Sequence, residues 1–372
     1  ACESSPELKN KADALIAEVA PLPSWCVDVL LSPDLLPQLF SSLGLSEHAA
    51  AGVCTTWSRA YSRQLRRCYY VNPRSVRQLA DVPPHPSGLC VLPGGVLAIA
   101  SRGIHHIGVN FVAARNDSDP QALAACQASS LATRRFEWPM GLALTNDGLL
   151  ACSYDSSIAL YKFAKDGSMD VLATVPVLAE YDRGFKKCAV HQQTQRTYAI
   201  GEAEEGNHAL VILDANLQVI ATVEATDGAP DDEEDYEPIR DVAVHGDQVI
   251  ILTNDSHAKG TGLRMLDLDG RFLGTIAPEY FKNPQLVAAS HGRVFVVDDN
   301  VEVDDDGEDG APLLRGKVLH VFDIQSGDIL QSVRFEVLGS ASAILVDGDE
   351  IFITSFIGAS TVCVLRFAGS EA

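Results

Sequence analysis

Apolar and polar positions along most of the chain follow a pattern that recurs from about residue 87 to the C-terminus. Its clearest copy spans residues 140–163 and reads as an apolar strand, a tight turn, a second apolar strand and a third, alternating strand. Asn146-Asp147-Gly148 supplies the turn, because a small polar residue followed by glycine accepts the positive φ that a hairpin requires. Short apolar runs bounded by turn residues predict antiparallel strands.

Six copies of this unit can be counted. Their first two strands cover residues 88–99, 140–154, 188–200, 241–252, 286–297 and 343–354. A unit that repeats at this spacing buries its apolar face only against neighbouring copies, which is typical of the blades of a β-propeller. We therefore expect an all-β, six-bladed β-propeller over residues 69–372.

One strand-like segment, residues 75–82, precedes the first full unit. The last unit has only three strands, at residues 341–346, 350–355 and 361–367. An unpaired outer edge would be exposed to association with other chains, and closing the ring removes it. We expect strand 75–82 to complete the last blade.

Helical periodicity replaces this pattern over residues 24–68. Ser32 can cap a helix that begins at Pro33, leucines follow at helical spacing, and Gly44 can end it. Two further short helices are expected before residue 68. The sequence thus predicts a small all-α domain after an N-terminal extension of residues 1–23.

The helical segment resembles an F-box. The resemblance covers about residues 30–61, from Ser32-Pro33-Asp34 through a leucine-rich helix to Val53-Cys54-Thr55-Thr56-Trp57. It implies binding of a Skp-family linker protein and, through it, of a cullin-based ubiquitin ligase. The residues that it implies for this contact are Pro33, Leu35, Leu36, Leu39, Phe40, Leu43, Val53, Cys54 and Trp57. The alternative is a helical cap that only packs on the propeller.

The strand repeats resemble NHL-type propellers, because Pro139-Met140-Gly141-Leu142 and the segment after Pro86 share a Pro-x-Gly-Leu pattern. Together the two resemblances imply the substrate-recognition adaptor of an SCF-type (Skp, cullin, F-box) ubiquitin ligase. In that role the propeller presents an unknown protein substrate on one of its faces. The adaptor would act by raising the local concentration of substrate, so we expect no catalytic residue and no cofactor.

Charge and cysteine content narrow the possible partners. The net charge of −22 disfavours nucleic acid and anionic membranes, both of which attract basic surfaces. The nine cysteines are irregularly spaced and include no Cys-x-x-Cys pair, which favours reduced thiols and a cytoplasmic or nuclear location. Cys90, Cys152 and Cys188 lie in apolar strand runs and are expected to behave as small hydrophobic residues.

Two other functions stay open: a scaffold without a link to a ligase, and a hydrolase similar to propeller lactonases. Lactonases hold a metal in the central channel with oxygen ligands from several blades, and Glu202, Asn254 and Asp299 end second strands here. His105-His106 has no companion at metal-ligand spacing.

Acidic stretches at residues 231–237 and 298–309 are expected to form solvated loops that could favour a Lys- or Arg-rich partner. The second has EF-hand-like spacing at Glu302, Asp304 and Asp306. It carries Leu313, however, where a calcium loop needs a bidentate glutamate.

Overall fold

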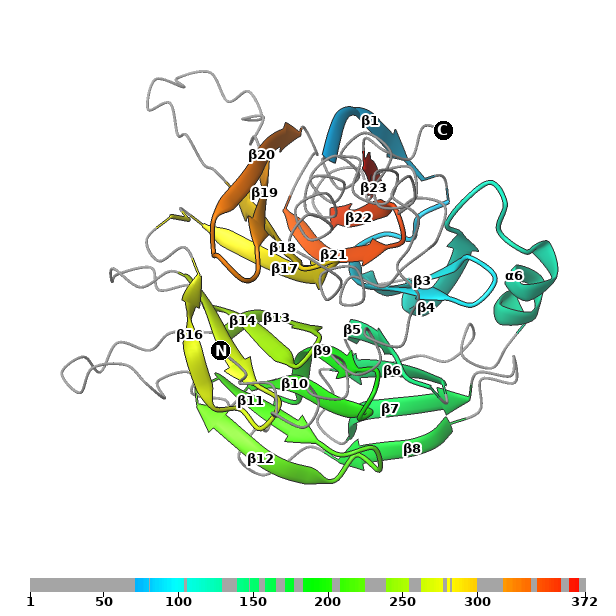
Figure 1. Ribbon diagram of the computed structural model, residues 1–372. Helices are drawn as coiled ribbons and strands as arrows, with labels where there is room; N and C mark the ends of the chain where they lie inside the picture. The colour runs from blue at the N-terminus through cyan, green and yellow to red at the C-terminus, as the bar shows by residue number, and fades with distance from the viewer. Residues whose placement is uncertain are drawn as a thin grey trace, which may run out of the picture. The chain divides into compact units, whose positions relative to one another are not determined.

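The computed structural model (Figure 1) describes residues 71–79, 81–103, 106–128, 139–146, 148–153, 158–164, 171–176, 183–202, 208–224, 239–253, 262–276, 280–281, 283–299, 317–335, 340–355 and 361–367. The expected extension (1–23) and F-box-like domain (24–68) lie outside these residues, as do all nine residues expected to contact a Skp-family protein. Val71–Phe367 forms one compact unit that is separate from the rest of the chain.

This unit is a β-propeller built from antiparallel sheets. The first sheet has three strands, β2 (Pro86–Leu92), β3 (Val96–Gly103) and β4 (His106–Ala113). The next two blades have four strands each: β5 (Pro139–Leu144), β6 (Gly148–Ser153), β7 (Ile158–Ala164) and β8 (Val171–Pro176), then β9 (Phe185–His191), β10 (Arg196–Glu202), β11 (His208–Leu213) and β12 (Val219–Glu224).

Two further blades repeat this order. They consist of β13 (Ile239–His245), β14 (Gln248–Thr253), β15 (Gly262–Asp267) and β16 (Phe272–Ile276), then β17 (Pro284–Ser290), β18 (Arg293–Asp299), β19 (Lys317–Asp323) and β20 (Ile329–Phe335). The last blade combines β21 (Ala341–Asp347), β22 (Glu350–Ser355) and β23 (Thr361–Phe367) with β1 (Val71–Gln78).

The expectation of six full blades is therefore corrected. Five sheets have the four strands of a blade, whereas the sheet of β2, β3 and β4 has three in the described part of the chain. Its repeat departs from the others after β4, because Asp119 caps a helix, α6 (Pro120–Gln127), and accepts a hydrogen bond from the amide of Gln121. This helix contacts β4 (Figure 1).

β1 closes the ring by pairing antiparallel with β23, with Val71 opposite Phe367 and Gln78 opposite Cys363. The sequence predicts this strand at residues 75–82, so the observed strand begins and ends earlier. The Gln331 side chain of β20 adds a second attachment, since it accepts from the Val71 amide at 2.9 Å and donates to the Val71 carbonyl at 2.8 Å. The ring thus takes one strand from before the first repeat.

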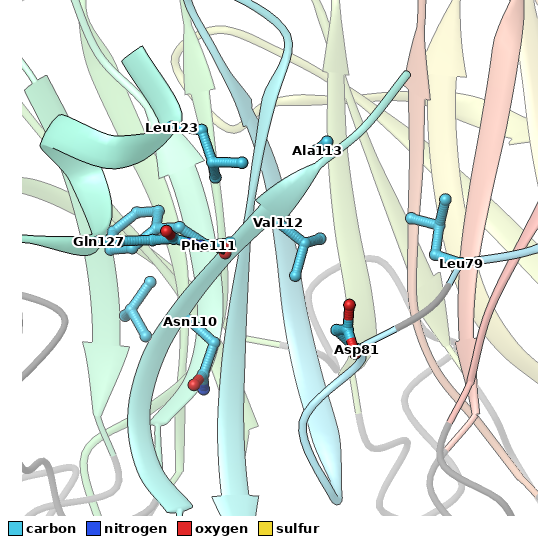
Figure 2. Close-up of a pocket in the computed structure, with 9 residues that line it drawn as sticks. Leu79, Asp81, Asn110, Phe111, Val112, Ala113, Leu123 and Gln127 are labelled. Carbon is cyan, nitrogen blue, oxygen red and sulfur yellow. Dashed lines mark hydrogen bonds between the residues drawn. The ribbon is translucent and has the colours of Figure 1, made fainter. Parts of the chain in front are cut away.

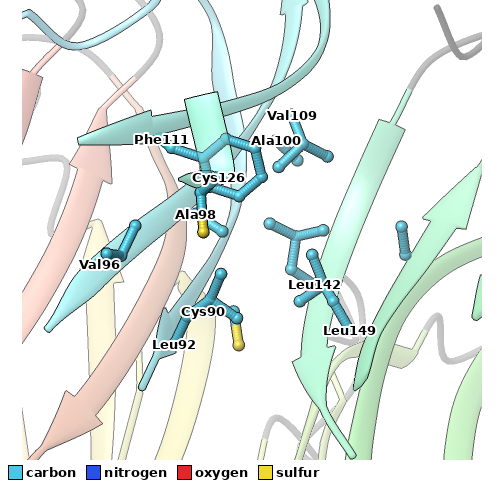
Figure 3. Packing of buried hydrophobic residues seen from close by; sticks show 11 residues of the cluster. Cys90, Leu92, Val96, Ala98, Ala100, Val109, Phe111, Cys126, Leu142 and Leu149 are labelled. Carbon is cyan, nitrogen blue, oxygen red and sulfur yellow. The ribbon is translucent and has the colours of Figure 1, made fainter. Parts of the chain in front are cut away.

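The hydrophobic core lies between the faces of neighbouring sheets. Figure 3 shows one such layer, in which Cys90 and Ala98 face Leu142 and Leu149 of the next blade, while Cys126 of α6 closes one side. Middle strands such as β11 are buried along their whole length, whereas the outer strand β12 alternates exposed and half-buried residues. Second strands such as β18 are likewise buried along their whole length, which explains why the second strands read as continuous apolar runs.

Cys90 and Cys152 are buried, Cys188 is half-buried, and all three are free thiols. Burial raises the pKa of the Cys363 thiol to about 11 and that of Cys90 further, so these groups are protonated at neutral pH. In the described segments, no helix has the length and apolar character needed to cross a bilayer.

Candidate functional site

The inner strands of the six sheets form a closed series around the propeller axis. β2 contacts β5, β5 contacts β9, and the contacts continue through β13, β17 and β21 back to β2. In each inner strand, the second residue has no partner in the pairing with the neighbouring strand of its sheet. This register shift is a β-bulge. The skipped residues, which we call the bulge ring, are Ser87, Met140, Lys186, Arg240, Gln285 and Ser342.

Hydroxyl groups of the bulge ring tie neighbouring inner strands together. The Ser342 Oγ donates to the carbonyl of Pro86 at 2.5 Å, and the Ser87 Oγ donates to the carbonyl of Pro139. Gly141 permits the close approach of β5 to β9, because a Cβ at that position would lie 3.1 Å from the Cα of Lys187. These strands are therefore fixed at the end where the bulge ring lies.

Lys187, the residue after the bulge in β9, crosses the axis. Its Nζ donates to the carbonyl of Ser87 at 3.0 Å and to the carbonyl of Ser342 at 2.5 Å, on two other inner strands. Burial lowers the pKa of Lys187, and the charge of Asp241 acts in the opposite direction. Asp241 of β13 accepts backbone hydrogen bonds from Val242 and from Val287 on β17, each at 3.0 Å. A half-buried cation and a buried anion thus link five of the inner strands.

We expect Lys187→Met to destabilise the propeller by about 3 kcal/mol, because it leaves two carbonyls and the Asp241 carboxylate without their cation. Urea unfolding followed by circular dichroism measures this loss. The double variant Lys187→Met/Asp241→Asn removes both charges and is expected to lose less than the sum of the two single variants. Additive losses would contradict an electrostatic link between the two residues.

A cationic cluster lies beside this link and consists of Arg183, Lys186 and Arg240. Arg183 and Lys186 contact the buried Glu202, and the charge of Arg240 acts on Lys186. Glu202 ends β10, where its Oε1 lies 3.3 Å from Nη1 of Arg183 and its Oε2 pairs with Nζ of Lys186. The pKa of Lys186 is lowered to about 8. Burial is the largest cause, and the positive charges of Arg240 and Arg183 act in the same direction. Lys186 is therefore mostly protonated at neutral pH but held among like charges.

His208 forms the other wall of the cluster. Its Nε2 lies 3.4 Å from Lys186 Nζ and 3.5 Å from Glu202 Oε2, and its Nδ1 donates to the carbonyl of Ile239 at 2.8 Å. Burial lowers the pKa of His208 to about 4, with Lys186 acting in the same direction, so the imidazole is neutral at pH 7. The hydrogen bond to Ile239 fixes β11 to the start of β13, directly before Arg240.

Two of the three residues considered for a metal, Glu202 and Asp299, are engaged by cations. Asp299 accepts from Lys317 Nζ at 2.5 Å in a pair that is almost completely buried, and Glu202 pairs with Arg183 and Lys186. Asn254 lies outside the described residues, as do His105 and the acidic residues 302–307. Over the described ranges, no group of three or more His, Cys, Asp or Glu side chains is placed to hold a metal ion.

Sequence reasoning missed Lys187, Asp241 and the bulge ring. A signal for the ring exists, since the recurring Pro-x-Gly segments place Ser87 and Met140 at equivalent positions of their repeats. Lys187 has no local signal, because its partners lie 100 and 155 residues away in the sequence.

A second feature is a cavity of about 460 Å³ beside β4, on the side of the sheet where the five full blades carry their outer strand (Figure 2). Gln127 of α6 reaches into this region and donates to the carbonyl of Phe111 at 3.1 Å. The lining residues are Leu79, Asp81, Val109, Asn110, Phe111, Val112, Ala113, Leu123 and Gln127. Asp81 is the one carboxylate in this lining, Asn110 and Gln127 are amides, and the other side chains are apolar. The cavity therefore offers few groups for catalysis or for binding a metal.

Comparison with known proteins agrees with the fold and goes no further. No family model matches the chain, and no curated protein matches it. A protein of unknown function from Bacteroides thetaiotaomicron is 10% identical with a TM-score of 0.50, covering 78% of this chain and 71% of that one. The PQQ-bound aldose sugar dehydrogenase of Streptomyces coelicolor is 14% identical with a TM-score of 0.47, covering 78% and 98%. The WD40 domain of Neurospora crassa Pan2 is 11% identical with a TM-score of 0.46, covering 80% and 97%.

At such low sequence identities, the similarity supports the fold and says nothing about function. The protein is a β-propeller protein, with its polar side chains gathered where the inner strands begin.

Proposed function

We propose that the protein is a substrate-recognition adaptor, in which the propeller binds a target protein and the F-box-like segment binds a Skp-family linker that connects to a cullin. The observation that carries this proposal is the closure of the ring by β1. β1 begins at Val71 and pairs with β23, and Val71–Phe367 forms a compact unit of its own. We infer that the segment with the F-box-like motif, which precedes this unit in the sequence, binds a separate partner.

The polar groups of the propeller support binding over hydrolysis. Glu202 and Asp299 are each neutralised by basic side chains, and a bound divalent cation would have to compete with them. Lys187 crosses the axis at the bulge ring and would repel a metal ion placed there. We therefore rank the adaptor ahead of a lactonase-like hydrolase. The unknown target, in this proposal, binds at the face that carries the bulge ring.

Replacing both Leu36 and Leu39 by Ala is expected to abolish binding of the full chain to a purified Skp-family protein. In an F-box, apolar side chains on short helices form the partner surface, and truncating such central contacts typically costs about 2 kcal/mol or more each. Isothermal titration calorimetry measures the binding, and the melting transition of the propeller is expected to stay unchanged.

Leu330→Ala, on the outer strand β20, is a matched control that removes the same atoms from the propeller and is expected to retain binding. If the unmodified chain fails to bind any purified Skp-family protein at micromolar concentration, the adaptor proposal is wrong.

A further inference from the structure

Positive charge accumulates at one sector of the bulge ring, although the whole chain has a net charge of −22. Arg183, Lys186 and Arg240 are three cations, and Glu202 is the carboxylate that Arg183 and Lys186 contact. His208 adds no positive charge, because its imidazole is neutral at pH 7. The described side chains of the cationic cluster thus carry more positive than negative charge.

Lys186 and Arg240 occupy equivalent positions on neighbouring inner strands. Both are bulge residues, on β9 and β13, and these two strands contact each other. A bulge redirects a side chain away from the regular hydrogen-bond ladder, and here it lies near the start of each inner strand. Arg240 is exposed, whereas Lys186 is half-buried and lies deeper in the cluster. The pair therefore offers one exposed guanidinium and one half-buried ammonium.

The cluster already holds a carboxylate of its own chain. Both oxygens of Glu202 contact basic groups, and the surrounding strands are fixed by the hydrogen bond from His208 to the Ile239 carbonyl. Burial lowers the pKa of Lys186, repulsion by Arg240 and Arg183 acts in the same direction, and a second anion would relieve that repulsion. Preorganised cations that need little rearrangement bind anionic side chains through charge-assisted hydrogen bonds.

We propose that the cationic cluster at the bulge ring binds an acidic segment, rich in Asp or Glu, of a partner protein. The inference names the class of target for the proposed adaptor and rests on that function only for its biological meaning, since the binding itself needs no ligase. The carboxylate of Glu202 among the same cations shows that carboxylate chemistry is accommodated. The exposed Arg240 contacts the acidic segment directly, and the half-buried Lys186 adds a second positive charge to the site.

The test uses the full chain and a fluorescein-labelled peptide of twelve residues in which Glu and Ser alternate, with fluorescence anisotropy as the readout. Arg240→Gln is expected to weaken binding by about tenfold, the effect of losing one charge-assisted contact. Arg334→Gln is the matched control, because Arg334 is an exposed arginine on the outer strand β20. Equal affinities of the two variants, or equal binding of a Lys/Ser peptide, would overturn the proposal.

The pH dependence gives an independent readout. The charged or titratable groups that face Lys186 are Glu202, His208, Arg183 and Arg240. Since the pKa of Lys186 is about 8, the affinity for the Glu/Ser peptide is expected to fall as the pH rises from 7 to 9. The same affinity at both pH values would exclude Lys186 from the site and contradict the proposal.

The acidic stretch at residues 231–235 precedes β13 in the sequence and provides a further check. Its replacement by Ser and Asn is expected to leave peptide affinity equal or tighter, because it removes a competitor of the same charge. Weaker binding would contradict the proposal. Measuring Skp-family binding on the same preparations separates the two proposals: peptide binding without Skp binding refutes the adaptor alone, and the reverse result refutes the acidic-segment site alone.

Discussion

A chain that begins at Val71 is expected to fold and to melt within about 3 °C of the full chain, whereas a chain that begins at Ala80 is expected to be insoluble or largely unfolded. The nine residues that separate the two truncations are β1 and Leu79, whose amide donates to the Val362 carbonyl at 3.0 Å. Without β1, the apolar strand β23 becomes an open sheet edge, which is prone to pair with other chains. Gln331 would also lose both of its backbone partners on Val71.

Soluble yield, size-exclusion chromatography and thermal unfolding by circular dichroism distinguish the two truncated chains. The chain from Val71 serves as the control for removal of the N-terminal segment as such. A chain from Ala80 that remains monomeric and melts like the longer one would show that ring closure by β1 contributes little to stability.

Local sequence patterns predicted the repeated hairpins, because the information lies within each hairpin. Residues 241–252 read as two apolar strands around a glycine, and the structure has β13 and β14 there with Gly246 at a φ of +54°. The helix α6 was also readable, since Asp119 followed by Pro120 is a helix start signal.

Long-range polar links could not be read from the sequence in the same way. Glu350 lies next to a turn in an ordinary hairpin, yet its partners Arg77 and Arg115 are 273 and 235 residues away. A buried carboxylate needs cations, but the sequence offers many and does not indicate which of them the fold brings near. The same limit applies to Lys187 and to the cationic cluster, where the deciding contacts join strands of different sheets.

Glu350, a residue of the blade that closes the ring, has no exposed surface. Its Oε1 accepts from Arg77 of β1 at 3.1 Å and from Arg366 of β23 at 2.9 Å, and its Oε2 accepts from Arg115 at 2.9 Å. Arg115 follows β4, so this single carboxylate connects the closing blade with the three-stranded sheet. Arg115 also binds Asp347 through Nη2 at 2.7 Å.

Glu350→Ala is expected to lower the free energy of unfolding by about 3–5 kcal/mol, because it leaves three guanidinium groups without their shared anion. Asp347→Asn is the matched control: Asp347 contacts the same Arg115 but is 37% exposed, and surface ion pairs contribute about 1 kcal/mol or less. Urea unfolding at pH 7 measures both losses. Equal losses for the two variants would contradict a special role for the buried carboxylate.

The pH profile tests the charge of Glu350 separately from its shape. Burial acts to raise the pKa of Glu350, but hydrogen bonds from Arg366, Arg77 and Arg115 outweigh it, so the pKa lies below the usual value of 4.5. A carboxyl group with a lowered pKa in the folded state stabilises the protein above its unfolded pKa, and this contribution is lost as the pH falls through the folded value. The stability difference between the unmodified chain and Glu350→Gln is therefore expected to be constant from pH 7 to about 5 and to shrink below pH 4.5. A difference that stays constant down to pH 3 would mean that the charge of Glu350 does not stabilise the closed ring.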